Sequence, residues 1–112
     1  MSERSEKIAA LNDAFRSTLG SDGSGKVLLT QGIQAMDPED QLAILKLVQK
    51  FNTFSEANNP YGERDFGSFS YNEERLNWKI DYYDPSMQWG SEDPADPEKT
   101  LRVLTVLLAS EY

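Results

Sequence analysis

The chain has 112 residues, of which 38% are hydrophobic, and its 19 acids against 11 bases give a formal net charge of −8. It contains no cysteine and no histidine, which excludes disulfides, zinc–thiolate sites, thiol nucleophiles and histidine as a general base. This length predicts one domain, residues 1–112, with a single hydrophobic core.

The first predicted element is an amphipathic helix over residues 3–19. Its apolar residues recur at helical spacing until Gly20 ends the pattern: Ile8, Leu11, Phe15 and Leu19. A flexible turn follows at residues 21–25, and residues 26–112 are expected to form an α+β body. A short apolar strand is predicted at 26–30, followed by an irregular or short helical connector at 31–36.

A second helix is predicted from Asp37 to about Phe51. Asp37 can cap free backbone amides, and Pro38 suits the first helical position. Residues 52–63 are polar and predict an exposed loop.

A β-hairpin is predicted next, with strands at 65–71 and 76–83 around residues 72–75. The second strand alternates, with Leu76, Trp78, Ile80 and Tyr82 on one face and Asn77, Lys79, Asp81 and Tyr83 on the other. In the first strand Phe66 is out of phase with the later aromatics, so Gly67 is predicted to mark a β-bulge.

The last predicted elements follow a loop at residues 84–95. Asp96 and Pro97 repeat the capping pattern of Asp37 and Pro38. Residues 101–109 predict a helix from the spacing of their leucines, with a buried strand as the alternative because two valines are β-branched. The fold class is therefore α+β: a small antiparallel sheet, made of the hairpin and one short strand, with about three helices packed on one face.

The charge is concentrated in the second half, where residues 51–112 carry twelve acids and five bases. Between Lys79 and Lys99 there are six acids and no base, interleaved with aromatic residues. Direct nucleic-acid binding needs basic residues, so no direct nucleic-acid partner is expected. No apolar run approaches the roughly 20 residues of a membrane helix and no signal region opens the chain, so a cytoplasmic protein without membrane association is expected.

The acidic stretch predicts a non-enzymatic surface for a basic protein, with no cofactor and no catalytic residue. The partner-binding residues predicted there are Asp81, Tyr83, Asp84, Trp89, Glu92, Asp93 and Glu98. Two alternatives stay open: a divalent-metal-dependent hydrolase that uses Asp81 and Asp84, and a self-associating structural protein that forms a homodimer. Asp84 also begins a turn before Pro85, and its carboxylate could simply bond the turn backbone.

Several motifs in the second half resemble a bacterial family catalogued as domain of unknown function 3768. They are Trp78-Lys79-Ile80-Asp81-Tyr82-Tyr83-Asp84-Pro85, Gly90-Ser91, Asp93-Pro94-Ala95-Asp96-Pro97, Arg102-Val103-Leu104-Thr105 and Leu108-Ala109-Ser110-Glu111-Tyr112. The resemblance covers roughly residues 26–112 and implies no activity or catalytic residue. Its setting among mobile elements suggests an inhibitor of the anti-CRISPR or anti-restriction type, whose partner is a basic nucleic-acid-binding host defence complex.

Overall fold

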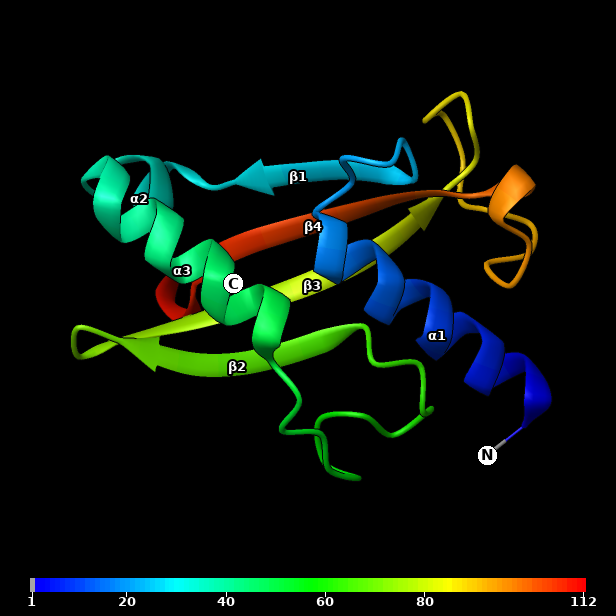
Figure 1. Ribbon diagram of the computed structural model, residues 1–112, viewed down its shortest axis with the longest axis horizontal. Helices are drawn as coiled ribbons and strands as arrows, with labels where there is room; N and C mark the ends of the chain where they lie inside the picture. The colour runs from blue at the N-terminus through cyan, green and yellow to red at the C-terminus, as the bar shows by residue number, and fades with distance from the viewer. Residues whose placement is uncertain (1) are drawn as a thin grey trace.

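A four-stranded sheet carries the helices of this protein on one face (Figure 1). The computed structural model describes residues 2–112. The elements, in chain order, are α1 (Glu3–Thr18), β1 (Gly25–Leu29), α2 (Gln31–Gln34), α3 (Pro38–Lys50), β2 (Phe66–Tyr71), β3 (Glu74–Tyr83), the 3₁₀ turn η1 (Pro97–Lys99), β4 (Leu101–Leu108) and the 3₁₀ turn η2 (Ala109–Glu111). The α+β class is confirmed.

The sheet is mixed, with the strand order β1-β4-β3-β2. β2, β3 and β4 pair antiparallel, whereas β1 pairs parallel with β4. The prediction of a wholly antiparallel sheet was wrong because it lacked the fourth strand, which lies between the hairpin and β1.

That missing strand is the segment 101–109, for which the sequence predicted a helix. It forms β4, with Val103, Leu104, Val106 and Leu107 all buried. An interior strand whose side chains are buried on both faces has a nearly continuous apolar run, and such a run contains residues at helical spacing by coincidence. The buried-strand alternative is confirmed.

The first helix agrees with its expected range to within one residue. The Ser2 hydroxyl accepts a hydrogen bond from the Ser5 amide at 3.0 Å, and Leu19 ends the helix in a left-handed conformation with φ of 52°. At α3, Pro38 occupies the first turn as predicted, but the Asp37 side chain accepts no capping hydrogen bond. The start of α3 is therefore set by backbone geometry and Pro38.

The hairpin has a regular register, so the predicted bulge at Gly67 was wrong. Gly67 lies opposite Trp78, and Phe66 lies opposite Lys79 on the other face of the sheet. A Cβ atom on Gly67 would lie 2.2 Å from Trp78 Nε1 and 2.8 Å from the Phe51 ring. The glycine is needed because the indole packs directly on the strand backbone.

The core lies between the sheet and the helices. Its fully buried members include Phe15, Ile33, Ile44, Val48, Leu76, Trp78, Leu104 and Val106. Arg16 joins the layers: its guanidinium lies 4.6 Å from the Trp78 ring and donates to the carbonyl oxygens of Val48 at 2.7 Å and Phe51 at 2.9 Å. Arg16, which belongs to α1, thereby donates hydrogen bonds to carbonyl oxygens at the C-terminal end of α3.

Within residues 2–112, no α-helix lies over the opposite face of the sheet, which we call the uncovered face (Figure 1). Lys79 and Asp81 are partly exposed there, with side-chain exposures of 39% and 41%. The chain returns to this face after β4, where the rings of Phe66 and Tyr112 meet edge to face with centroids 6.2 Å apart. Among residues 2–112, no helix is long and apolar enough to cross a membrane.

Candidate functional site

The acidic stretch forms an ordered extension of the sheet between β3 and β4. Tyr83 and Gly90 form an antiparallel bridge beyond the end of β3. The Asp84 amide donates to the Trp89 carbonyl oxygen at 2.8 Å, and the Ser91 amide donates to the Tyr82 carbonyl oxygen at 3.1 Å. We call residues 84–100 the acidic loop.

Asp84 organises the first turn of the acidic loop. Its carboxylate accepts hydrogen bonds from the Ser86 hydroxyl at 2.8 Å and from the amides of Gln88 and Trp89 at 3.1 and 3.2 Å. These donors, the Ser86 hydroxyl first, hold the pKa of Asp84 below its ordinary value. The Asp84 carboxylate therefore bonds the backbone of its own turn. The sequence offered this role as the alternative to partner binding.

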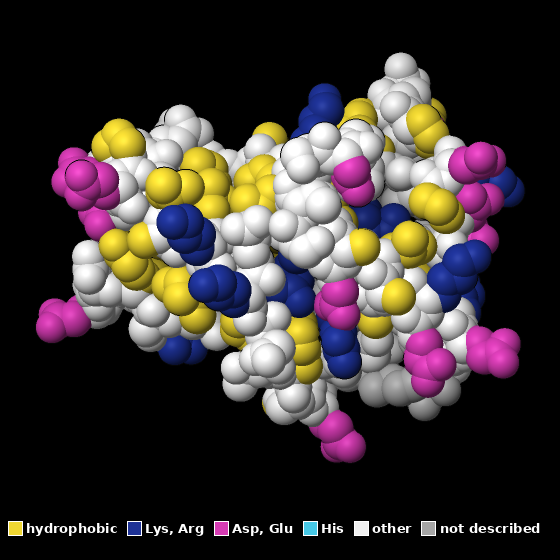
Figure 2. All heavy atoms as spheres, in the orientation of Figure 1, with side chains coloured by type: hydrophobic (Ala, Val, Ile, Leu, Met, Phe, Trp, Pro, Cys, Tyr) yellow, Lys and Arg dark blue, Asp and Glu magenta, His cyan; other side chains and the backbone are white. Residues whose placement is uncertain are grey.

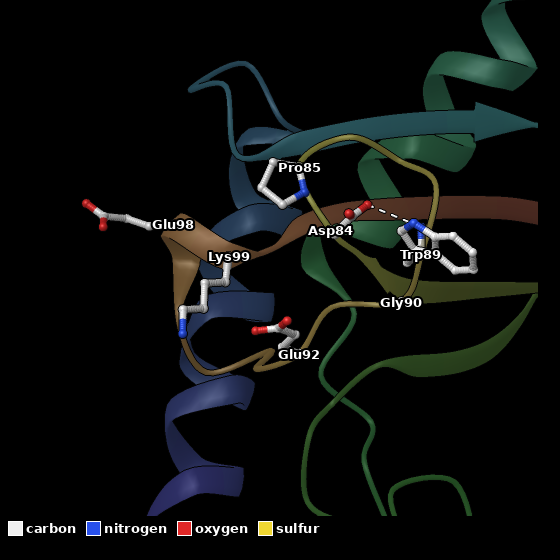
Figure 3. A pocket seen from close by; sticks show the side chains of 7 residues that line it. All are labelled: Asp84, Pro85, Trp89, Gly90, Glu92, Glu98 and Lys99. Atoms are coloured by element: carbon white, nitrogen blue, oxygen red, sulfur yellow. Dashed lines mark hydrogen bonds between the residues drawn. The ribbon is translucent and has the colours of Figure 1, made fainter.

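Trp89 is the aromatic residue that this turn presents to solvent. Its exposed fraction is 72%, against 0% for the other tryptophan, Trp78. It borders a shallow depression of about 370 Å³ whose other lining residues are Asp84, Pro85, Gly90, Glu92, Glu98 and Lys99. In Figure 3 Trp89 lies at one end of the depression, Lys99 and Glu98 at the other, and Glu92 between them. An apolar ring with carboxylates beside it can meet a basic, partly apolar surface.

Asp93 and Asp96 hold the second half of the acidic loop. Asp93 Oδ1 accepts from the Ala95 amide at 3.1 Å and lies 3.4 Å from the Arg4 guanidinium. Asp96 accepts from the Glu98 amide at 2.9 Å, so its predicted capping role is confirmed on the short turn η1. The pair of Arg4 and Asp93 also joins the loop to the start of α1.

Asp81 and Tyr83 belong to the uncovered sheet face and do not line the depression beside Trp89. Asp81 forms an ion pair of 2.9 Å with Lys79. The seven predicted residues therefore do not form one site. Four of them line the depression in the acidic loop, namely Asp84, Trp89, Glu92 and Glu98. Asp93 belongs to the same loop but pairs with Arg4. Asp81 and Asp84 have different neighbours, and residues 2–112 hold no group of three or more potential metal ligands. The hydrolase alternative stays a prediction.

Two sets of residues escaped the sequence reasoning. Pro85 and Lys99 line the depression beside Trp89, although a proline and a lysine in a loop do not by themselves indicate a binding site. A second depression on the uncovered face is bordered by Tyr61, Asp65, Phe66 and Tyr112, together with Lys79 and Asp81. The polar loop 52–63 contains two aromatic residues, Phe54 and Tyr61. Their types do not show that Phe54 packs against Phe51 and Trp78 whereas Tyr61 is 77% exposed.

No curated protein and no solved structure matches the chain. A family model described as Protein of unknown function (DUF3768) matches residues 29–111. The matched segment spans β4, the acidic loop and the hairpin, and leaves out α1. Because the match covers most of the chain, this protein belongs to that family.

Proposed function

We propose that this chain is a non-enzymatic interaction domain that presents the acidic loop to a basic protein. The observation that carries the proposal is Trp89, an indole 72% exposed on a turn that Asp84 fixes with three hydrogen bonds. An exposed aromatic side chain on an ordered backbone loses little entropy on binding and is typical of interface hot spots.

Charge supports the class of partner. Glu92 and Glu98 are exposed on the depression that Trp89 borders, and the first turn of α1 adds Glu3 and Glu6 at the same end of the molecule. Figure 2 shows acidic side chains gathered at this end, where α1 begins. Carboxylates on such a surface attract a basic groove and can occupy positions that a nucleic acid's phosphates would take.

The partner in this proposal is a nucleic-acid-binding protein in the cytoplasm, such as a host defence complex. The chain would then act as an inhibitor of the anti-CRISPR or anti-restriction type that competes with nucleic acid. The support is the net charge of −8, which disfavours direct binding to a phosphate backbone.

The test is affinity capture from a bacterial lysate, followed by a binding measurement with each purified basic protein that is recovered. Wild type is compared with a Trp89→Ala, Glu92→Gln, Glu98→Gln variant. A Glu56→Gln, Glu73→Gln variant removes two exposed carboxylates elsewhere, as many as the loop variant does, and is the control for net charge.

The expected result is a nucleic-acid-binding protein that binds wild type and the control variant equally. The loop variant should bind at least about tenfold more weakly, and salt or competing DNA should reduce wild-type binding. The proposal would be contradicted if wild type, the loop variant and the control variant bound the partner equally. It would also be contradicted if competing DNA did not reduce the binding of wild type.

A further inference from the structure

An exposed leucine lies on the uncovered face of the sheet, in the edge strand β1 (Figure 1). Leu28 is 51% exposed. It lies opposite Thr105 of β4, and Thr105 lies opposite Lys79 of β3, so these three side chains share one face. Lys26 precedes Leu28 by two positions and therefore points to the same face. We call Lys26, Leu28, Thr105 and Lys79 the β1 patch.

The β1 patch carries a positive charge that the chain does not neutralise. Lys79 Nζ lies 2.9 Å from Asp81 Oδ2, so these two charges cancel. Lys26 is exposed, and within residues 2–112 no carboxylate forms an ion pair with it. An apolar side chain beside an unpaired lysine is therefore open to solvent on a chain whose net charge is −8.

The acidic loop carries the opposite combination. Trp89 is 72% exposed, and Glu92 and Glu98 are exposed on the depression that it borders. In the part of the chain that the structure describes, neither glutamate forms an ion pair. Asp84 keeps the backbone around Trp89 ordered through hydrogen bonds from the amides of Gln88 and Trp89. One chain thus presents an apolar side chain with unpaired acids and another with an unpaired base.

The two surfaces do not cover each other within one chain, because Trp89 and Leu28 both stay largely exposed. Between two copies, the indole can lie on the leucine and remove both apolar side chains from water. A carboxylate near the indole then meets Lys26, and the lysine ammonium can also lie over the aromatic ring. The apolar contact and the charge contact therefore favour the same arrangement.

We propose that the β1 patch binds the acidic loop of a second copy of this chain, with Trp89 on Leu28 and Glu92 or Glu98 beside Lys26. The contact goes beyond the proposed function, because it needs no basic partner. Both contacts use Trp89, so a basic partner and a second copy exclude each other at the acidic loop.

The first test is sedimentation equilibrium of the whole chain by itself. The contact is small and should be weak, so the chain is measured from about 10 μM to about 1 mM. The average mass should rise above that of one chain across this range, and added sodium chloride should lower it because exposed charges are screened. A chain that stays monomeric throughout would overturn this contact. It would leave the proposed function standing, because the test of that function measures binding to a different protein.

Substitutions of the two apolar side chains locate the contact. Leu28→Thr and Trp89→Ala should each weaken self-association at least about tenfold, because a central apolar side chain carries much of the affinity of an interface. Leu42→Gln is the matched control and should associate like wild type, since Leu42 is a similarly exposed leucine, at 56%, on α3. Circular dichroism checks that each variant is folded. Undiminished association of a folded Leu28→Thr or Trp89→Ala variant would contradict the proposal.

Charge reversal tests which surfaces meet. Lys26→Glu, and a second variant with Glu92→Lys and Glu98→Lys, should each be monomeric by itself because like charges then face each other. An equimolar mixture of the two variants should associate like wild type, since every acidic-loop position again meets a patch of opposite charge. Lys46→Glu, which reverses an exposed lysine on α3, is the control for net charge and should associate like wild type. Wild-type association of either reversed variant by itself, or a mixture that stays monomeric, would overturn the proposal.

Discussion

The Arg102 guanidinium donates a hydrogen bond from Nε to Asn12 Oδ1 across 2.6 Å, and so connects α1 to the central strand β4. Both side chains are buried, with exposures of 2% and 0%. Asn12 also donates from Nδ2 to the Tyr82 hydroxyl and the Glu63 carbonyl oxygen, each at 2.9 Å. One asparagine therefore satisfies groups from three separate segments.

Replacing this asparagine should be strongly destabilising. In Asn12→Ala the buried Arg102 loses an acceptor, and a buried charged group without its partner costs more than the loss of an exposed hydrogen bond. We expect the free energy of unfolding to fall by about 3 kcal/mol in urea titrations. Asn52→Ala, at an exposed position, should change it by less than about 0.5 kcal/mol. Equal values for the two variants would contradict the role of Asn12.

Gly67 should not tolerate a side chain. In Gly67→Ala the new methyl group would meet the Trp78 indole and the Phe51 ring. We expect a loss of about 2 kcal/mol in the free energy of unfolding and a shifted Trp78 emission spectrum. Gly90→Ala is the control, because its nearest atom would be 3.9 Å away, and it should fold with wild-type stability. A stable Gly67→Ala variant would show that the indole does not pack on this strand.

The hairpin turn between β2 and β3 can be improved. Asn72 and Glu73 both have positive φ, of 49° and 69°, which glycine adopts without strain at the second position. Glu73→Gly should raise the free energy of unfolding by about 0.5 kcal/mol. Glu74→Gly changes the first residue of β3, which pairs with Tyr71, and should lower the free energy of unfolding because glycine has a low strand propensity. Thermal unfolding followed by circular dichroism distinguishes the two signs.

The turn that carries Trp89 should depend on pH through Asp84. The pKa of this carboxyl is lower in the folded chain than in the unfolded one, so its contribution is present above the unfolded pKa of about 3.9 and is lost as pH falls through the folded value. Hydrogen exchange at the Gln88 and Trp89 amides should therefore become faster, relative to the unfolded chain, at low pH.

Substitutions separate this effect from general acid unfolding. Asp84→Ala should speed exchange at the same two amides at neutral pH, whereas Asp84→Asn keeps an acceptor oxygen and should protect them without the pH dependence. Unchanged exchange in Asp84→Ala would show that the carboxylate does not hold the turn.

Local sequence signals predicted the elements that local chemistry determines. Helix spacing gave α1, Pro38 gave the start of α3, and alternation gave both faces of β3. The signals failed where tertiary contacts decide. β4 is a strand because it lies between β1 and β3, where side chains on both of its faces are buried. Gly67 is needed because the indole of Trp78, eleven positions later in the chain, packs on its backbone.

The candidate site was only partly predictable for the same reason. The acids and Trp89 could be found from composition, and the turn role of Asp84 from the proline that follows it. The ion pair of Asp81 with Lys79 could not be predicted from composition or from turn residues, because strand residues two positions apart share a face but need not touch. Tyr61 and Tyr112, which are 51 positions apart in the sequence, border one depression only because the fold brings the loop before β2 and the last residues together.

The parallel pairing of β1 with β4 also bears on the order in which the chain folds. β1 has no other strand partner, and Thr30 bonds the Val106 carbonyl oxygen across a sequence separation of 76 residues. Closing so large a loop is slow compared with forming the hairpin. On the ribosome, β1 (Gly25–Leu29) therefore lacks its strand partner until residues 102–106 have emerged, and in that interval it is open to chaperones and to wrong pairing.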